Sequence, residues 1–174
     1  MPLVVTPGDA TADSYASVAQ ADAWHVGRGN AAWAALTETA KETALRRATT
    51  WIDATYGSRF GALPVYPRVQ ALAWPRTGAT DADGYAVPSD AIPVEIVRAA
   101  SEAALREALT PGSLSPDYVA SAAVVREKVG PLEVEYRGSS GASSVSPVLT
   151  VVDGLLAPLL GRNSRGGMRM LVRA

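Results

Sequence analysis

Side chains able to do acid–base or nucleophilic chemistry are few in this chain. His25 is the single histidine among 174 residues, and cysteine is absent. A catalytic histidine needs a nucleophile or a carboxylate as its partner, and no motif of that kind accompanies His25. The lack of cysteine excludes thiolate catalysis, disulfides and zinc–thiolate sites. We therefore expect no enzyme, and we expect His25 to be a capping or surface residue near the end of a helix.

Two short segments resemble ligand-binding loops. Asp81-Ala82-Asp83-Gly84 looks like the middle of a calcium loop, but with Gly84 at the sixth position the first position is Ala79, which offers no carboxylate. An Asp-Gly turn is the better interpretation. Gly27-Arg28-Gly29 lacks the third glycine, the preceding strand and the lysine of phosphate-binding loops. The sequence thus predicts no metal, nucleotide or other cofactor.

Aromatic residues beside arginines raise the possibility of nucleic-acid binding. Three pairs are close in sequence: Trp74 with Arg76, Tyr56 with Arg59, and Tyr66 with Arg68. Such pairs are typical of proteins that stack on single-stranded bases. The competing interpretation is core packing, because an alanine-rich domain needs large side chains to fill its volume. Core packing also fits the tryptophans at helix positions, Trp24, Trp33 and Trp51. The formal net charge of −1 gives the whole molecule no general attraction to phosphates.

The composition is that of one globular domain with a helical core. Hydrophobic residues make up 48% of the chain, charged residues 19% and aromatic residues only 6%, with alanine filling much of the difference. Such a composition favours closely packed helices. Residues 1–10 lack the basic and long apolar regions of a signal peptide, and no apolar run reaches the roughly 20 residues that span a bilayer. We expect a protein made in a reducing cytoplasm, with no membrane partner.

Helical periodicity and capping residues predict about four helices. The first spans residues 17–26, with Ser14 or Ser17 as its cap and Gly27 in the left-handed conformation after it. A short helical piece is expected at 31–36, and the second helix at 37–55. The second helix should bury a face made of Leu45, Ala48, Ile52 and Tyr56. The third should run to Leu109 from a cap at Ser89 or Asp90, burying Val94, Val97, Ala104, Leu105 and Ala108.

A β-hairpin is expected at residues 124–136, turning at Gly130-Pro131. This register pairs Lys128 with Glu133 and Arg126 with Glu135 on one face, and Val129 with Leu132 on the other. Charge pairing and apolar pairing therefore agree on one register.

The long segment 57–92 has no clear periodicity and contains several prolines. An irregular segment of this length in a compact domain is usually functional. We expect it to lie at an interface between subunits, with contacts from Trp74, Arg76 and Tyr85.

The C-terminal part is apolar and then basic. A last helix is expected at 147–160, capped by Ser146, with a kink or break at Pro158. It is apolar around nearly its whole circumference, so we expect another chain to cover it. The tail 161–174 carries arginines without acids, and it either follows phosphates or docks on a protein groove; we favour the protein. The expected partner contacts are Leu155, Leu156, Leu159, Arg162, Arg165, Met168, Arg169, Met170, Leu171 and Arg173.

Several motifs together resemble a known family. They are Asp13-Ser14-Tyr15, Trp33-Ala34-Ala35-Leu36, Gln70-Ala71-Leu72-Ala73-Trp74-Pro75-Arg76-Thr77-Gly78, Ile92-Pro93-Val94-Glu95-Ile96, and Glu127 through Tyr136. In their order and spacing the chain is similar to a phage-encoded family named as DnaT-like single-stranded-DNA-binding proteins. In architecture it also resembles the head–tail connector adaptors of long-tailed phages. The resemblance covers residues from about 13 to 160, and no single motif in it is chemically diagnostic.

The resemblance implies a structural role. It implies a small, mainly α-helical domain with one β-hairpin and extended N- and C-terminal arms, assembled as a ring, commonly dodecameric, beneath the portal. The arms are expected at 1–13 and 161–174, around a helical connector domain at 14–160. The partners implied are the portal protein and the next neck protein, a stopper or tail terminator. DNA would pass through the channel without specific recognition, and the protein would reside in the virion neck. The alternative is a DnaT-like single-stranded-DNA-binding protein.

Overall fold

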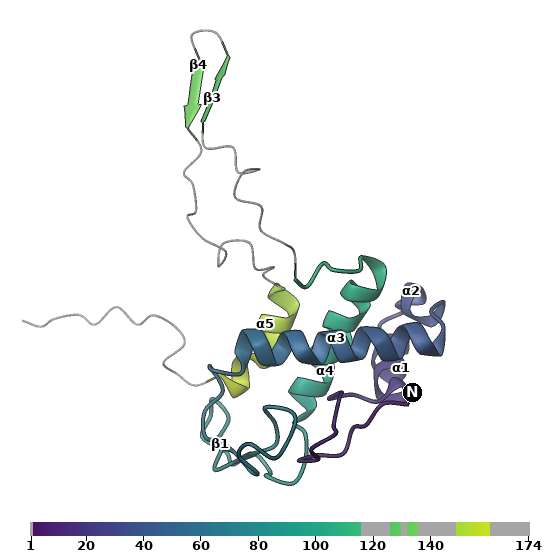
Figure 1. Cartoon of the computed structure of the whole chain (residues 1–174), viewed down its shortest axis with the longest axis vertical. Helices are drawn as coiled ribbons and strands as arrows, with labels where there is room; N and C mark the ends of the chain where they lie inside the picture. The colour runs from purple at the N-terminus through teal and green to yellow at the C-terminus, as the bar shows by residue number, and fades with distance from the viewer. Residues whose placement is uncertain (1, 116–125, 130–131, 136–148, 161–174) are drawn as a thin grey trace, which may run out of the picture.

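The computed structural model describes residues 2–115, 126–129, 132–135 and 149–160. Within these ranges the chain is mainly helical with one longer hairpin, as expected (Figure 1). The helices are α1 (Val18–Val26), α2 (Ala31–Ala34), α3 (Glu38–Tyr56), α4 (Val94–Leu109), α5 (Thr150–Leu156) and the 3-10 helix η3 (Ala157–Leu159). The strands are β1 (Leu63–Pro64), β2 (Arg76–Thr77), β3 (Arg126–Val129) and β4 (Leu132–Glu135). β1 pairs antiparallel with β2, and β3 with β4.

The helix starts follow local capping chemistry. Ser17 caps α1 in a full capping box, in which its hydroxyl accepts from the Gln20 amide and the Gln20 side chain accepts from the Ser17 amide. The expectation for Gly27 was wrong: it keeps a helical φ of −61°, and Gly29 takes the left-handed conformation at +66°. The helical turn continues through Gly27, whose N–H donates to the carbonyl of Ala23.

Helices α3 and α4 pack on each other and form the centre of the domain. The predicted face of α3 is confirmed, since Leu45, Ala48, Ile52 and Tyr56 are all buried. The side of α4 that faces the core differs from the prediction. Its buried apolar residues are Ile96, Ala99, Ala100, Ala103 and Ala104.

The predicted stripe on α4 was therefore largely wrong. Of its members only Ala104 is fully buried, Val97, Leu105 and Ala108 are partly buried, and Val94 is 49% exposed. Small alanines let the axes of two helices approach closely, so they occupy the contact line while larger side chains flank it. The cap was also misplaced: α4 begins at Val94 with Pro93 as its N-cap residue, and no side chain caps it.

The last helix belongs to the core of this same chain. α5 packs on α4, and Val152, Leu156 and Leu159 are buried. The Tyr56 hydroxyl donates to the Asp153 carboxylate at 2.7 Å and ties α5 to α3. Our expectation that another chain covers this helix was wrong for Val152, Leu156 and Leu159, which this chain's own core buries. Val151 alone among the large apolar residues of α5 stays 58% exposed.

The boundaries of the last helix were partly predicted. The break at Pro158 is confirmed, since α5 ends at Leu156 and continues as the 3-10 helix that contains this proline. The helix starts at Thr150 with Leu149 as its N-cap residue, later than predicted. The predicted cap, Ser146, lies outside the described residues.

The hairpin has the predicted register. Arg126 lies opposite Glu135, Lys128 opposite Glu133, and Val129 opposite Leu132. Its turn and its outermost predicted residues are outside the described part of the chain. Among the described elements, β3 and β4 pack extensively only with each other.

Candidate functional site

A buried polar cluster joins two of the motifs on which the family resemblance was based, Asp13-Ser14-Tyr15 and the segment 70–78. The Tyr15 hydroxyl donates to one carboxylate oxygen of Asp53 and accepts from the Trp74 amide at 3.2 Å. The other oxygen of Asp53 accepts from the Ala73 amide at 3.0 Å. Burial raises the pKa of Asp53, although its hydrogen bonds and the Arg76 charge oppose the rise. The cluster therefore fastens the start of the chain and the 57–92 segment to α3.

Arg76 organises the loop that follows α3. Its guanidinium donates to the carbonyls of Gly61 at 2.7 Å, Ala62 at 2.6 Å and Ala73 at 3.0 Å. It is 7% exposed, and its neighbour Trp74 is 1% exposed. Of the predicted subunit-interface residues, these two lie inside the subunit, and only Tyr85 presents its ring to solvent, at 73% exposure. An arginine suits this role because its planar guanidinium carries five N–H donors and can bond several loop carbonyls at once.

His25 is a buried structural residue, not a surface one. Its Nε2–H donates to the Ser101 carbonyl at 3.1 Å, and its Nδ1 accepts from the Asn30 side-chain amide at 2.9 Å. Only a neutral ring satisfies both bonds with Asn30 as the donor. Burial lowers the pKa of His25. The ring also lies 4.7 Å from that of Trp33, centroid to centroid, so His25 joins α1, α2 and α4.

The segment at Asp81 is a turn, as predicted. The Asp81 carboxylate accepts from the amides of Asp83 and Tyr85, at 3.0 and 2.9 Å, and Gly84 has a φ of +92°. These bonds use the carboxylate within its own loop. Within the described ranges, no three His, Asp or Glu side chains gather closely enough to hold a metal ion.

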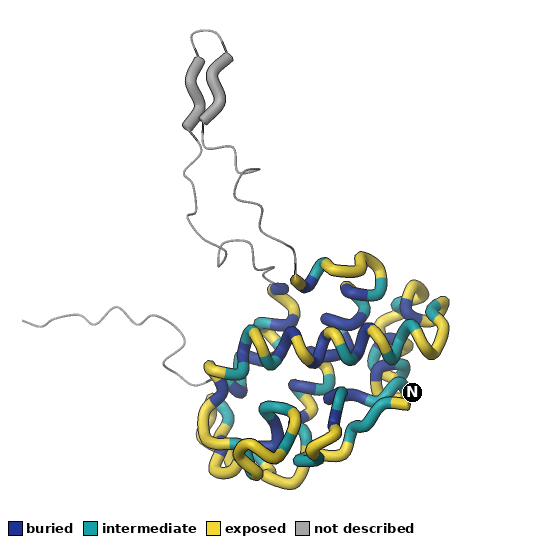
Figure 2. The backbone as a smooth tube through the Cα atoms, viewed as in Figure 1, coloured by how far each residue is buried: buried dark blue, intermediate teal, exposed yellow. Residues whose placement is uncertain are grey.

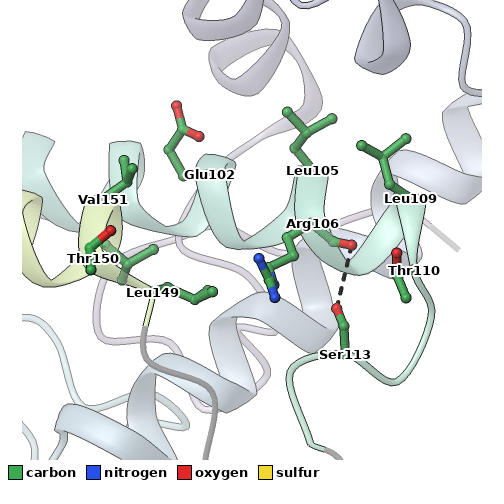
Figure 3. Close-up of a pocket in the computed structure, with 10 residues that line it drawn as sticks. Glu102, Leu105, Arg106, Leu109, Thr110, Ser113, Leu149, Thr150 and Val151 are labelled. Atoms are coloured by element: carbon green, nitrogen blue, oxygen red, sulfur yellow. Dashed lines mark hydrogen bonds between the residues drawn. The ribbon is translucent and has the colours of Figure 1, made fainter.

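A pocket of about 470 Å³ opens between the C-terminal half of α4 and the start of α5 (Figure 3). Its apolar lining includes Leu105, Leu109 and Leu149, and Leu109 is 57% exposed. Arg106 and Ser113 lie at its edge, where the Ser113 hydroxyl contacts the Arg106 carbonyl at 3.4 Å. The lining is mixed, since Glu102, Arg106, Thr110, Ser113 and Thr150 lie beside the apolar residues.

Three exposed apolar side chains of the irregular segment lie on the loop after α3. Leu63 is 70% exposed, Tyr66 55% and Val69 64%, and Figure 2 shows this part of the chain as largely exposed. Exposed Arg59 precedes them, and exposed Arg68 lies between Tyr66 and Val69 in the sequence. We call Leu63, Tyr66 and Val69 the loop surface. Exposed apolar groups that gather on a soluble domain commonly mark a contact with a partner.

The predicted aromatic–arginine pairs separate into two groups. Trp74, Arg76 and Tyr56 are buried. The core-packing interpretation is therefore confirmed for the rings of Trp74 and Tyr56. Tyr66 and Arg68 remain on the surface. The tryptophans at 33 and 51 are buried as expected, while Trp24 is half-buried between α1 and α4, with its Nε1–H donating to Glu102.

The predicted partner contacts of the C-terminal region fall into three groups: buried, partly buried, and outside the described residues. Leu156 and Leu159 are buried in this chain's own core, and Leu155 is partly buried. The remaining predicted contacts lie outside the described residues: Arg162, Arg165, Met168, Arg169, Met170, Leu171 and Arg173. Sequence reasoning missed the exposure of Leu63, Val69 and Leu109. An apolar residue in an aperiodic loop, or at the last position of a helix, was the available signal.

No helix in the described ranges has both the length and the apolar character to cross a membrane. Neither a curated protein nor a solved structure matches the chain. A family model does match, over residues 1–174, and its description is "Putative DnaT-like ssDNA binding protein". Two of the motifs that carried the resemblance, at Tyr15 and at 70–78, meet in the cluster around Asp53. The chain belongs to this DnaT-like family.

Proposed function

We propose that this chain is a structural connector of a tailed bacteriophage, with copies that form a ring on the portal and link the head to the neck. The observation that carries the proposal is the β3–β4 hairpin, on which none of the described helices packs extensively. A two-stranded hairpin alone is only marginally stable in water. In a ring every copy has a neighbour, so each hairpin has a chain to pack against.

The use of the charged and aromatic groups also supports a structural role. Arg76 and Trp74 brace the interior, Arg47 pairs with Glu107 at 2.8 Å, and Arg28 stacks on Trp24. A nucleic-acid groove needs cations and rings that are free to meet phosphates and bases. Trp74, Arg76, Arg47 and Arg28 each make their contacts within the domain itself.

The experiment is to mix the chain with purified portal rings and to image the mixture by electron microscopy. We expect a second ring on the portal with the full chain, and none when residues 161–174 are deleted. A second variant replaces residues 126–135 with a short Gly-Ser linker, and thermal unfolding checks that both variants keep a folded domain. Full-strength portal decoration by both folded variants would contradict the proposal.

Single-stranded-DNA binding is the second candidate, favoured by the family's description and by two exposed rings. Tyr66 lies beside exposed Arg68, and Tyr85 is 73% exposed. Anisotropy of a labelled oligothymidine tests it. Several phosphate contacts would weaken binding steeply between about 50 and 200 mM salt. Loss of binding on Tyr66→Ala and Tyr85→Ala, but not on the matched exposed control Val69→Ala, would favour this candidate over the connector.

A further inference from the structure

Two apolar surfaces lie near opposite ends of α3. At its C-terminal end the chain continues into β1 and the loop surface of Leu63, Tyr66 and Val69 (Figure 1). At its N-terminal end α1 and α2 form an apolar pocket of about 360 Å³ beside Lys41. A helix of 19 residues is about 28 Å long. The two surfaces are therefore too far apart to cover each other within one subunit.

The loop surface is held in shape from beneath. Arg76 fixes the carbonyls of Gly61 and Ala62 that precede Leu63. The Gln70 side chain accepts from the Tyr66 amide at 3.0 Å and donates to the carbonyls of Leu72 and Pro75. These bonds fix the backbone on both sides of the exposed residues.

The loop also contains costly backbone conformations. Ala62 and Arg68 both have a φ of +64°, a region that side chains other than glycine rarely adopt. Such strain persists only where the surroundings impose it, and it is concentrated at functional positions. Gly8 of the N-terminal arm also packs against the Tyr66 ring, since a Cβ at Gly8 would lie 2.9 Å from Cε2. The backbone of the loop surface is thus held in place before any partner binds.

The pocket at the other end is concave and stays open in the single chain. We call it the α2 pocket; Val26, Ala31, Trp33 and Ala34 form its apolar lining. Val26 is 75% exposed, and Ala31 and Ala34 are exposed as well. The volume is sufficient for a large side chain.

The charges of the two surfaces are also complementary. Residues 57–80 contain no acid, and exposed Arg59 and Arg68 lie before and within the loop surface. The α2 pocket is bordered by Asp22, whose side chain is 41% exposed, and exposed Glu38 follows α2 at the start of α3. Lys41 beside the pocket pairs with Asp22 at 2.9 Å and offsets part of its charge, so exposed Glu38 contributes the remaining acid near the pocket. A second copy of this chain therefore offers the loop surface both an apolar pocket and opposite charge.

We propose that the loop surface of one copy inserts into the α2 pocket of the next, giving a head-to-tail contact. This inference rests on the proposed ring and names the surfaces that build it. A contact between two different surfaces leaves one of each free on a pair of subunits, so it propagates until a ring closes. The exposed apolar side chains of both ends are then covered in every copy.

The absence of cysteine in the natural chain makes a clean test possible. Two single variants, Leu63→Cys and Ala34→Cys, are mixed and oxidised mildly, and the disulfide-linked products are separated without reductant. Both positions are exposed, so the substitutions leave the core intact. We expect Leu63–Ala34 heterodimers to exceed either homodimer several-fold. The double variant should give a ladder that ends at one closed species.

A matched control uses Ala54→Cys, an exposed position on α3 outside both surfaces. Mixed with Ala34→Cys, it should give only background cross-linking. A second comparison tests the charge of the loop surface with Val69→Cys as the reacting loop residue and Ala34→Cys as the pocket residue. Adding Leu63→Glu to the chain that carries Val69→Cys should reduce cross-linking several-fold. Adding Leu63→Glu to the chain that carries Ala34→Cys should leave cross-linking unchanged, because that chain contributes only its pocket. Equal cross-linking of the Ala54 and Leu63 variants would overturn the inference.

The outcomes separate this inference from the proposed function. Rings on the portal without Leu63–Ala34 coupling would overturn the head-to-tail contact and leave the connector role standing. The mixed-cysteine coupling without any portal-bound ring would support the contact and overturn the connector role. Predominant Leu63–Leu63 homodimers would show a two-fold contact, which also overturns the head-to-tail arrangement.

Discussion

The hydroxyl of Tyr15 donates a hydrogen bond to the carboxylate of Asp53, although 38 residues separate them in sequence. The same hydroxyl accepts from the Trp74 amide, 59 residues further along than Tyr15. One side chain thus connects the start of the chain, the central helix and the loop after it. The position of the segment that carries Leu63, Tyr66 and Val69 depends on this connection.

Tyr15→Phe should destabilise the fold without changing its shape. The change removes a donor to a buried carboxylate and an acceptor for the Trp74 amide, which costs about 1–3 kcal/mol. Urea unfolding followed by circular dichroism measures the free-energy difference. The exposed tyrosine offers a control, since Tyr85→Phe should stay within about 0.5 kcal/mol. Equal effects of the two changes would contradict the assigned role of the cluster.

Arg76→Lys should destabilise the loop that carries Leu63 and Tyr66. Lysine cannot reach the carbonyls of Gly61, Ala62 and Ala73 together from one planar group. We expect a loss of about 2 kcal/mol in unfolding free energy, because carbonyls are left without a donor. Limited proteolysis should then cut within residues 57–76 faster than in the natural chain. Arg68→Lys, at an exposed position, is the control and should behave as the natural chain.

Trp33 and Trp74 form a matched pair for measuring one hydrogen bond. Both are 1% exposed, but Trp33 Nε1–H donates to Asp22 at 2.7 Å, whereas Trp74 Nε1–H is buried with no partner among the described residues. Replacement by phenylalanine removes similar volume from both sites. Trp33→Phe should therefore cost about 1–2 kcal/mol more than Trp74→Phe. A larger loss for Trp74→Phe in denaturant titrations would show that its N–H is bonded after all.

Stability should fall as the pH decreases below about 6.5, through His25. Burial lowers the pKa of His25 in the folded protein, so in this range the unfolded chain binds a proton that the folded chain rejects. The contribution of His25 is complete above the unfolded pKa and is lost as the pH falls through the folded pKa. Urea midpoints measured from pH 7.5 to 5.5 check this. Because His25 is the sole histidine, the His25→Gln variant should show a flatter profile in the same window.

Local patterns in the sequence determined several parts of this protein by themselves. The α1 cap, the buried face of α3, the helix break at Pro158 and the hairpin register follow from neighbours within a few residues, or from a pairing that only one register satisfies. The turn at Asp81 is equally local.

Only the tertiary structure decided which surfaces are free. The apolar circumference of α5 indicated an outside partner, but α5 packs on α4, and Val152 and Leu156 are buried in this chain's own core. Trp74 and Arg76 looked like surface groups, yet their partners Phe60 and Gly61 are distant in sequence. Periodicity shows that a side chain must be buried, but not against which segment. That choice depends on contacts among residues far apart in the chain, and no local pattern records them.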